Sequence, residues 1–238
     1  MLLLSVAILA GGLATRLRPV TEKMPKSLLE VNAEPFLAHQ LRLLHRNGVR
    51  HVVLCVGYLG EKIRDFAGNG HAFGLDLEYS FDGPELLGTA GALKNALPLL
   101  GSEFLVLYGD SYLLCDYVNV ASVFQSSRKL ALMTVFRNDG QWDASNVEFE
   151  NGSILAYSKK NGTPRMKFID YGLGAFSAKA FTRVSPDQSR DLADLYGELL
   201  AEKQLAGLEI SQRFYEIGSA AGLEETARFL ASQGVAQV

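Results

Sequence analysis

The sequence lacks several features that would place it in other classes of protein. It has no long hydrophobic run, because the apolar N-terminal stretch ends at the glycine pair 11–12 and is too short to cross a bilayer. No basic residue precedes this stretch and no cleavage site follows it, so we expect neither a signal peptide nor a membrane anchor. The formal net charge is −3, and without a basic excess we expect no nucleic acid partner.

Cysteine and histidine are also scarce. The two cysteines, Cys55 and Cys115, lie in apolar stretches without metal-ligand spacing, which predicts buried free thiols in a reducing cytoplasm. The four histidines show no pattern for a metal or for nucleophilic catalysis. Internal repeats and linkers are absent, so the 238 residues predict one domain, as a monomer or small homo-oligomer.

What the first half does contain is an alternation of apolar strands and amphipathic helices. We expect strands at 3–9, 51–56, 75–79 and 104–108. Helices should lie between them, the first opened by Pro35 and the third ending before Pro98. This alternation predicts an α/β fold with a doubly wound, mostly parallel, Rossmann-like sheet, in which ligands bind at the carboxyl ends of the strands.

The second half has a mixed α/β pattern. Asn151-Gly152 and Tyr171-Gly172 are each flanked by strand-like segments, which predicts two hairpins. Helices are expected at 191–202 and 221–231, and a strand at 214–217. We therefore predict one domain over 1–238, made of a half at 1–112 and a mixed half at 113–238.

The glycine loop after the first strand carries the strongest local signal for function. Leu9, Ala10, Gly11 and Gly12 let the backbone approach a ligand closely and direct N–H groups at anions, and Arg16 and Lys26 add positive charge. The loop is neither a Walker A motif nor a complete dinucleotide fingerprint. From the loop alone, polyphosphate binding and an ordinary strand-to-helix turn both remain open.

Two carboxylates are candidate metal ligands. Asp110 follows Gly109 at the end of a buried strand, where an acid either caps a turn or binds a metal. Glu216 interrupts an apolar strand, where it either faces outward or supplies a second ligand. Mg²⁺ favours one or two carboxylates together with phosphate oxygens, so the pair predicts a magnesium site beside the glycine loop.

Three further segments are candidate ligand contacts. Gly88 and Thr89 open a helix whose N–H groups either read a base or an anion, or simply begin a closely packed helix. One lysine of the pair 159–160 would meet a sugar phosphate if that strand end lies over the sheet, although surface charge is the default interpretation. The segment 170–172 offers a carboxylate and backbone groups to a sugar hydroxyl.

Taken together, these segments resemble the sugar-1-phosphate nucleotidyltransferase family, also called NDP-sugar pyrophosphorylases. The resemblance implies a GT-A-like fold and a Mg²⁺-dependent reaction of an NTP with a sugar 1-phosphate, giving an NDP-sugar and pyrophosphate. In size the chain is similar to the compact heptose-1-phosphate guanylyltransferases and muramate-phosphate uridylyltransferases. The segments that carry the resemblance follow the family's order along the chain: 9–17, 25–29, 87–92, 109–110, 152–160, 170–172 and 215–219.

The resemblance also implies a role for each candidate residue. Arg16 would hold the leaving pyrophosphate, Lys26 would neutralise charge at the α-phosphorus, and Asp110 with Glu216 would hold Mg²⁺. The half 1–112 would bind the nucleotide, and 113–238 would bind the sugar and close the site. The remaining roles are nucleotide binding by Leu9, Ala10, Gly11, Gly12, Gly88, Thr89 and Gly109, and sugar-phosphate binding by Lys160, Asp170 and Gly172.

Three positions depart from the family pattern. Ala14 replaces a common glycine, which is mild if φ is negative there; Lys159 replaces a common glutamate; and Glu216 replaces a common aspartate. GTP with heptose 1-phosphate is the favoured pair, and the alternatives are UTP with an amino-sugar or muramate 1-phosphate, or CTP or dTTP. A non-catalytic nucleotide-sugar-binding domain is the alternative from another class.

Overall fold

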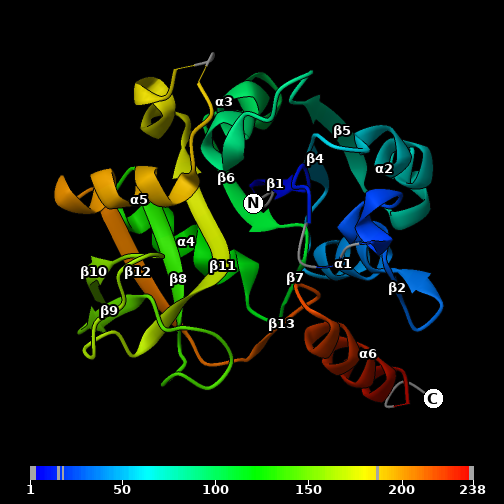
Figure 1. The fold of residues 1–238 in the computed structure, drawn as a ribbon. Coiled ribbons are helices and arrows are strands. Elements are labelled where there is room, and N and C mark those ends of the chain that lie inside the picture. The colour runs from blue at the N-terminus through cyan, green and yellow to red at the C-terminus, as the bar shows by residue number, and fades with distance from the viewer. Residues whose placement is uncertain (1–3, 15–16, 18, 186–187, 236–238) are drawn as a thin grey trace.

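The structure is a computed structural model that describes residues 4–14, 17, 19–185 and 188–235. At its centre is a nine-stranded sheet in which β5, β4, β1 and β6 run parallel (Figure 1). Leu9 pairs with both Cys55 and Tyr108, so the strands reach one edge of the sheet together. The predicted mostly parallel sheet is therefore confirmed, with strands β1 (Ser5–Leu9), β4 (His51–Val56), β5 (Asp76–Phe81) and β6 (Glu103–Tyr108).

The second half extends the same sheet with antiparallel and parallel partners. Strand β11 runs antiparallel to β6 and to β8, and β12 runs parallel to β8. The hairpin of β9 and β10 turns at Asn151 and Gly152, which both have positive φ, as predicted. The strands are β8 (Ala131–Arg137), β9 (Val147–Glu150), β10 (Ser153–Tyr157), β11 (Phe168–Ser177) and β12 (Leu205–Ile210).

The hairpin predicted at Tyr171-Gly172 is wrong, because β11 runs straight through these residues. The register of β11 against β8 shifts between Asp170 and Gly174, and Gly172 has φ +98°. A glycine with positive φ serves a bulge as well as a turn. The sequence signal was therefore real, but it marks a bulge inside a strand.

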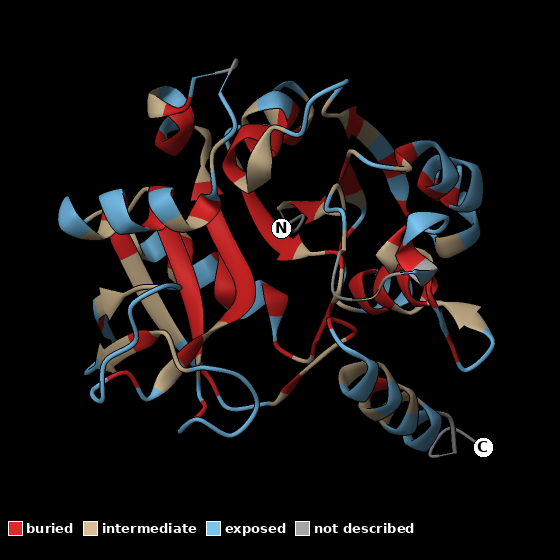
Figure 2. Ribbon diagram, in the orientation of Figure 1, coloured by how far each residue is buried: buried red, intermediate tan, exposed pale blue. Residues whose placement is uncertain are grey.

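Helices cover both faces of the sheet. The apolar side chains of α1, α2 and α4 pack with Val6 and Ile8 on one face, and those of α3 and α5 pack with Ala7 on the other. This double cover explains why the central strands β1, β4 and β6 are buried and read as nearly continuous apolar runs (Figure 2). The helices are α1 (Phe36–Arg46), α2 (Gly60–Ala67), α3 (Gly88–Leu100), α4 (Tyr117–Ser127), α5 (Leu192–Ala201) and α6 (Ala220–Val235).

Two helices differ from the predictions. Helix α3 continues past Pro98, which lies in its last turn, so the predicted end before this proline is wrong. Pro98 has no N–H to donate to the Lys94 carbonyl, and the helix ends two residues later. Helix α4 was not predicted; its N-cap is Asp116, whose carboxylate accepts a hydrogen bond from the Asn119 N–H at 2.9 Å.

Short elements bring the C-terminal part of the chain to the sheet edge. Strand β13 (Phe214–Glu216) pairs antiparallel with β7 (Ser111–Leu113), and β2 (Glu30–Val31) pairs with β3 (Glu34–Pro35). Helix α6 follows β13, and its Phe229 ring stacks on Tyr215 at 4.0 Å. The pairing of β13 with β7 places residue 216 next to the turn that follows β6 (Figure 1).

Candidate active site

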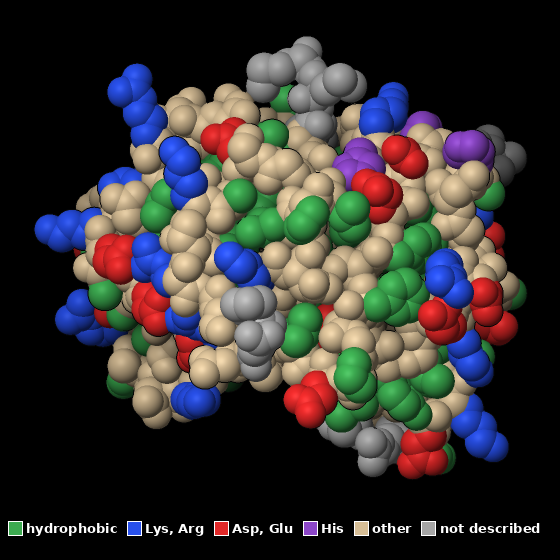
Figure 3. All heavy atoms as spheres, turned by 90° about the horizontal axis from the view of Figure 1, so that it is seen from above, with side chains coloured by type: hydrophobic (Ala, Val, Ile, Leu, Met, Phe, Trp, Pro, Cys, Tyr) green, Lys and Arg blue, Asp and Glu red, His purple; other side chains and the backbone are tan. Residues whose placement is uncertain are grey.

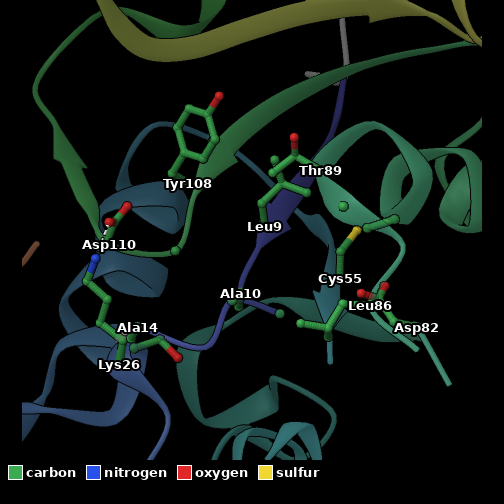
Figure 4. A pocket seen from close by; sticks show the side chains of 16 residues that line it. Leu9, Ala10, Ala14, Lys26, Cys55, Asp82, Leu86, Thr89, Tyr108 and Asp110 are labelled. Carbon is green, nitrogen blue, oxygen red and sulfur yellow. Dashed lines mark hydrogen bonds and ion pairs between the residues drawn. The ribbon is translucent and has the colours of Figure 1, made fainter. Parts of the chain in front are cut away.

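The carboxyl ends of β1 and β6 border a cavity of about 260 Å³ (Figure 4). It is lined from distant parts of the chain: the glycine loop after β1, the start of α3 and the turn after β6. Lys26 and Asp110 also line it, and Figure 4 shows their charged ends facing each other. Every residue predicted to bind the nucleotide lines this cavity: Leu9, Ala10, Gly11, Gly12, Gly88, Thr89 and Gly109.

Lys26 and Asp110 form the main ion pair of the cavity. The Lys26 ammonium donates a hydrogen bond to Oδ2 of Asp110 at 2.5 Å, and both side chains are largely but not fully buried. The Gly109 N–H donates to the Leu9 carbonyl at 2.9 Å, and a Cβ on Gly109 would lie only 3.0 Å from that oxygen. A glycine is therefore needed at 109 to bring the Asp110 turn this close to β1.

The structure also brings Glu216 to this ion pair. Glu216 pairs with Ser111 across β13 and β7, and the Ile217 N–H donates to the Asp110 carbonyl at 3.0 Å. A Cβ built on Gly218 would lie 3.3 Å from Oε1 of Glu216 and 3.6 Å from Nζ of Lys26. Two carboxylates and one ammonium, more than 80 residues apart in sequence, thus converge at one corner beside the cavity, although Glu216 itself does not line its wall.

The carboxylate pair suits a magnesium ion. Among the described residues, no group of three or more acidic, histidine or cysteine side chains forms a complete metal cage. Mg²⁺ needs few protein ligands, because phosphate oxygens and waters supply the others. Asp110 and Glu216 are therefore a suitable donor set for an ion that enters with a polyphosphate.

The loop beyond Gly12 is only partly described. Arg16, the predicted pyrophosphate ligand, lies outside the described residues. Ala14 has φ +48°, so the negative φ that would make alanine mild there is not found. The left-handed conformation costs an alanine about 1 kcal/mol. The Thr21 hydroxyl donates to the Ala14 carbonyl at 2.9 Å and holds the strained residue in place.

The start of α3 is bound to the start of α5. The Thr89 hydroxyl accepts a hydrogen bond from the Leu192 N–H at 2.6 Å and donates to Oδ1 of Asp191 at 3.2 Å. Gly88 has φ +70°, and a Cβ there would lie 2.6 Å from the Arg190 carbonyl oxygen. Gly88 and Thr89 thus line the cavity and also join two helices, so the closely packed helix start considered from the sequence is present.

The predicted sugar side lies beside Tyr108, across the cavity from the glycine loop. Oδ1 of Asp170 accepts a hydrogen bond from the Gly172 N–H at 3.0 Å, and burial raises the pKa of Asp170 while the charge of Lys159 lowers it. A Cβ on Gly172 would lie 3.7 Å from the Tyr108 ring. Asp170 and Gly172 therefore meet the end of β6.

Both lysines of the pair 159–160 are exposed, and only Lys159 has described contacts with this region. Nζ of Lys159 lies 5.5 Å from the centre of the Tyr108 ring and 3.9 Å from Oδ1 of Asp191. Lys160 is exposed, and its backbone N–H donates to the Ser158 hydroxyl at 3.3 Å. The described contacts bring Lys159 to the sugar side, and a sugar-phosphate contact by Lys160 stays a prediction.

Sequence reasoning missed seven residues of the cavity wall, among them Asp82, Tyr108 and Cys55. Asp82 follows β5 just as Asp110 follows β6, and this position after a strand was the available signal. Its Oδ2 accepts a hydrogen bond from the Leu87 N–H at 3.3 Å, and burial raises its pKa. Tyr108 and Cys55 also line the cavity. Burial raises the pKa of Cys55 to about 12, so this thiol is neutral.

Figure 3 shows basic and acidic side chains interspersed over the described part of one face, rather than a continuous basic patch. None of the described helices is long and apolar enough to span a membrane. Both cysteines are buried and free, as predicted.

Comparisons with known proteins agree with this geometry. Residues 5–233 match the family model described as Nucleotidyl transferase. The chain is 29% identical over 234 residues to an N-acetylmuramate alpha-1-phosphate uridylyltransferase of Neisseria meningitidis, which covers 92% of this chain and 94% of that protein. A D-glycero-alpha-D-manno-heptose 1-phosphate guanylyltransferase of Campylobacter jejuni is 30% identical over 154 residues. This match covers 64% of the present chain and 67% of that protein. The chain spans only 54% of a similar UTP–glucose-1-phosphate uridylyltransferase of Synechocystis.

Solved structures with the same fold point in the same direction. A putative glucose-1-phosphate thymidylyltransferase from Bacillus anthracis superposes with a TM-score of 0.83 at 22% identity, over 94% of each chain. HddC from Yersinia pseudotuberculosis, complexed with GMP-PN, superposes with a TM-score of 0.79 at 23% identity, over 95% and 99%. At these identities the likeness shows the fold, and the family follows from the sequence match. The chain belongs to the sugar-1-phosphate nucleotidyltransferase family, as a nucleotidyl transferase.

Proposed function

We propose that this enzyme transfers a guanylyl group from GTP to a heptose 1-phosphate in the cytoplasm, releasing pyrophosphate. The observation that carries the proposal is the Lys26–Asp110 pair, at 2.5 Å, inside a cavity lined by the glycine loop. The half at 1–112 would bind the nucleotide, and the half at 113–238 the sugar phosphate. UTP with a muramate or amino-sugar 1-phosphate is the alternative, because the uridylyltransferase relative covers nearly the whole chain.

The chemistry needs positive charge more than it needs a base. An oxygen of the sugar phosphate is already an anion when it attacks the α-phosphorus, and the bond from that phosphorus to the bridging oxygen of pyrophosphate breaks. The obstacle is the repulsion between two anions, which positioned cations reduce. Lys26 is proposed to supply its ammonium at the α-phosphate, and Arg16 is proposed to hold the leaving pyrophosphate.

The metal and the sugar side complete the proposed site. Asp110 and Glu216 would hold Mg²⁺, and when bound the ion neutralises phosphate charge. The sugar phosphate would lie against Asp170, Gly172 and the lysine that follows β10. Asp170 offers a carboxylate that accepts hydrogen bonds from sugar hydroxyls.

The first prediction compares Gly12, where glycine would leave room for a ligand, with Gly88, where glycine is needed for packing inside the protein. A Cβ on Gly12 meets nothing within 4 Å, whereas a Cβ on Gly88 meets the Arg190 backbone at 2.6 Å. We expect Gly12→Ala to change the free energy of unfolding by less than about 0.5 kcal/mol, and Gly88→Ala to lower it by about 2 kcal/mol or more. Urea unfolding measures both, and calorimetric titration with GTP should show weaker binding to Gly12→Ala. Unchanged GTP affinity in Gly12→Ala would contradict the proposal that the glycine loop binds the nucleotide.

Asp82 supports guanine as the base. A carboxylate accepts hydrogen bonds and donates none, and the Watson–Crick edge of guanine offers two adjacent donors, N1–H and the N2 amino group. Asp82 lies in the cavity wall near Gly11, with Oδ2 3.5 Å from the Cβ position of that glycine. The hydrogen bonds of guanine would also favour the charged form of a carboxylate whose pKa burial has raised.

The second prediction concerns this choice of base. We expect Asp82→Asn to lower the ratio of kcat/KM for GTP to that for UTP by about 10- to 100-fold, because a bidentate pair to a base is worth about 1–3 kcal/mol of discrimination. Glu85→Gln removes a charge from the same loop at an exposed position outside the cavity wall and should leave the ratio unchanged. A ratio that falls equally in both variants would show that only loop charge matters.

The proposed function is tested by a panel of NTPs and sugar 1-phosphates with pyrophosphate release as the signal. Release that requires GTP, a heptose 1-phosphate and Mg²⁺ together is the expected result. Faster release with UTP and a muramate 1-phosphate would establish the alternative pair. If no pair gives release while nucleotide sugars still bind, the protein is a non-catalytic nucleotide-sugar-binding domain.

A further inference from the structure

Gln40 is a buried polar residue whose place on α1 was not expected. The apolar stripe of this helix predicts that Gln40 points away from the core, but its exposed fraction is 1%. Leu37, Leu41 and Leu44 are buried as the stripe predicts. The difference arises because α1 packs against the sheet face on one side and against the turn after β6 on another.

The Gln40 amide bridges the turn that carries Asp110. Its Nε2 group donates one hydrogen bond to the Tyr108 carbonyl at 2.9 Å and one to the Ser111 carbonyl at 2.8 Å. These carbonyls stand on either side of Gly109 and Asp110, so both N–H bonds of one amide hold the two ends of the turn. No other described side chain donates to both ends of this turn.

Backbone groups make two further hydrogen bonds of the turn, and within the turn the Ser111 hydroxyl donates to Oδ1 of Asp110 at 3.4 Å. The Gly109 N–H donates to Leu9 of β1, and the Asp110 carbonyl accepts from Ile217, after β13. These two hydrogen bonds hold the middle of the turn against β1 on one side and against the residue after β13 on the other. The Gln40 amide fixes its ends, and the four hydrogen bonds together leave the Asp110 backbone little freedom.

The amide is retained at a cost in stability. Its Oε1 atom is buried and has no hydrogen-bond partner in the described part of the protein. A buried polar atom without a partner costs about 1–3 kcal/mol. An apolar side chain of the same length would avoid that cost but would leave the Tyr108 and Ser111 carbonyls without their donors, so the amide serves the turn.

We infer that Gln40 is a positioning residue, which holds the Asp110 turn so that its carboxylate stays directed at Lys26 and at the corner that Glu216 shares. The inference rests on the proposed role of Asp110. Gln40 does not line the cavity, and its described hydrogen bonds go only to the backbone of residues 108 and 111. A displacement of about 1 Å in a catalytic group lowers a rate by up to about 100-fold, which sets the scale of the effect.

Gln40→Met tests the inference, since methionine keeps the length of the side chain and removes both donors. We expect kcat to fall about 10- to 100-fold with little change in KM for GTP, because the turn shifts while the glycine loop stays. The Mg²⁺ concentration for half-maximal rate should rise several-fold. Mn²⁺ binding in the presence of a non-hydrolysable GTP analogue, followed by electron paramagnetic resonance, should weaken by the same factor.

Two further variants separate positioning from loss of stability. Leu44→Ala opens a cavity one turn along α1 and should destabilise the fold by about 2–5 kcal/mol, yet keep the wild-type kcat and metal dependence at a temperature where it is folded. Gln40→Glu keeps the shape, and its protonated acid restores one donor. Its activity and Mn²⁺ affinity should therefore exceed those of Gln40→Met, and more so at lower pH.

The inference is overturned if Gln40→Met binds Mn²⁺ and turns over like the wild type, or if Leu44→Ala loses metal affinity to the same extent. If Gln40→Met does not fold, the comparison of Gln40→Glu with the wild type decides, with unchanged Mn²⁺ affinity at every pH as the contrary result. A wild-type protein that releases no pyrophosphate with any substrate pair would instead refute the proposed function. The Mn²⁺ measurements would still test the role of Gln40 in that case.

Discussion

Asp110→Asn is expected to lower kcat by about 100- to 1,000-fold while the protein stays folded. The substitution keeps the shape of the side chain but removes the charge that Lys26 contacts and that is proposed to hold a divalent cation. Such preorganised electrostatic groups contribute about 2.7–4 kcal/mol to a transition state. Lys26 Nζ lies 2.5 Å from Asp110, so an amide oxygen there still accepts the hydrogen bond. Steady-state rates of pyrophosphate release and the thermal midpoint measure the two effects.

Asp116→Asn is the matched control for this change. Asp116 caps α4 by accepting a hydrogen bond from the Asn119 N–H, and it lies outside the cavity wall. Asparagine is as good an N-cap as aspartate, so this variant should keep both the stability and the kcat of the wild type. Near-normal turnover of Asp110→Asn, with normal Mn²⁺ affinity, would contradict the metal site proposed for Asp110.

Lys26→Met is expected to have the second largest effect, with kcat about 100-fold lower and GTP affinity changed far less. The ammonium is proposed to act on charge that develops at the α-phosphorus, so its loss raises the barrier more than it weakens ground-state binding. The same change removes the ion pair at Asp110. Mn²⁺ should therefore bind the variant at least as tightly as it binds the wild type, even though turnover falls.

Single-turnover kinetics and Mn²⁺ titration together test this expectation. A variant that binds GTP 100-fold more weakly, but reacts at the normal rate once saturated, would make Lys26 a binding residue only. Lys62→Met is a suitable control, because Lys62 is a lysine outside the cavity wall whose Nζ donates to the Lys23 carbonyl. Its loss should leave kcat and metal affinity unchanged.

Much of the fold follows from local patterns in the sequence. Strands β1, β4 and β6 were predictable because they are buried on both faces and read as apolar runs that small residues follow. The starts of α1 and α5 were also predictable, because Pro35 and Asp191 are residue types that commonly stand at the start of a helix. The bulge at Gly172 was not predictable as such, because a positive φ is equally suited to a turn and only the neighbouring strands decide between them.

The positions of site residues that directly follow a strand were predictable from the sequence. The positions of residues that depend on tertiary contacts were less predictable. The glycine loop and Asp110 follow β1 and β6, and they line one cavity because parallel strands end at one edge. The place of Glu216 beside Lys26 depends on the pairing of β13 with β7, and no local pattern predicts that pairing. The burial of Gln40 likewise depends on its contact with the turn after β6, where Ser111 is 71 residues away in sequence.

The family match supports nucleotidyl transfer onto a sugar 1-phosphate, and the proposed roles explain why the cavity has charged groups and no nucleophile–base pair. In the proposed mechanism, Lys26 and the carboxylates reduce the repulsion between two anions, and the anionic acceptor needs no deprotonation. The same view explains the packing around Asp110, whose turn is held by β1, α1 and the residue after β13. Precise placement of one carboxylate is what such a mechanism requires.

The fate of the α-phosphate is the most direct test of the proposed transfer of a guanylyl group from GTP to a sugar 1-phosphate. GTP labelled at the α-phosphorus would be incubated with the enzyme, Mg²⁺ and heptose 1-phosphate, and the products separated by chromatography and identified by mass. The account predicts that the label enters an NDP-sugar, in step with the release of one pyrophosphate, and only when the sugar phosphate is present. Label found in GMP or GDP, or release that does not depend on the sugar phosphate, would contradict it.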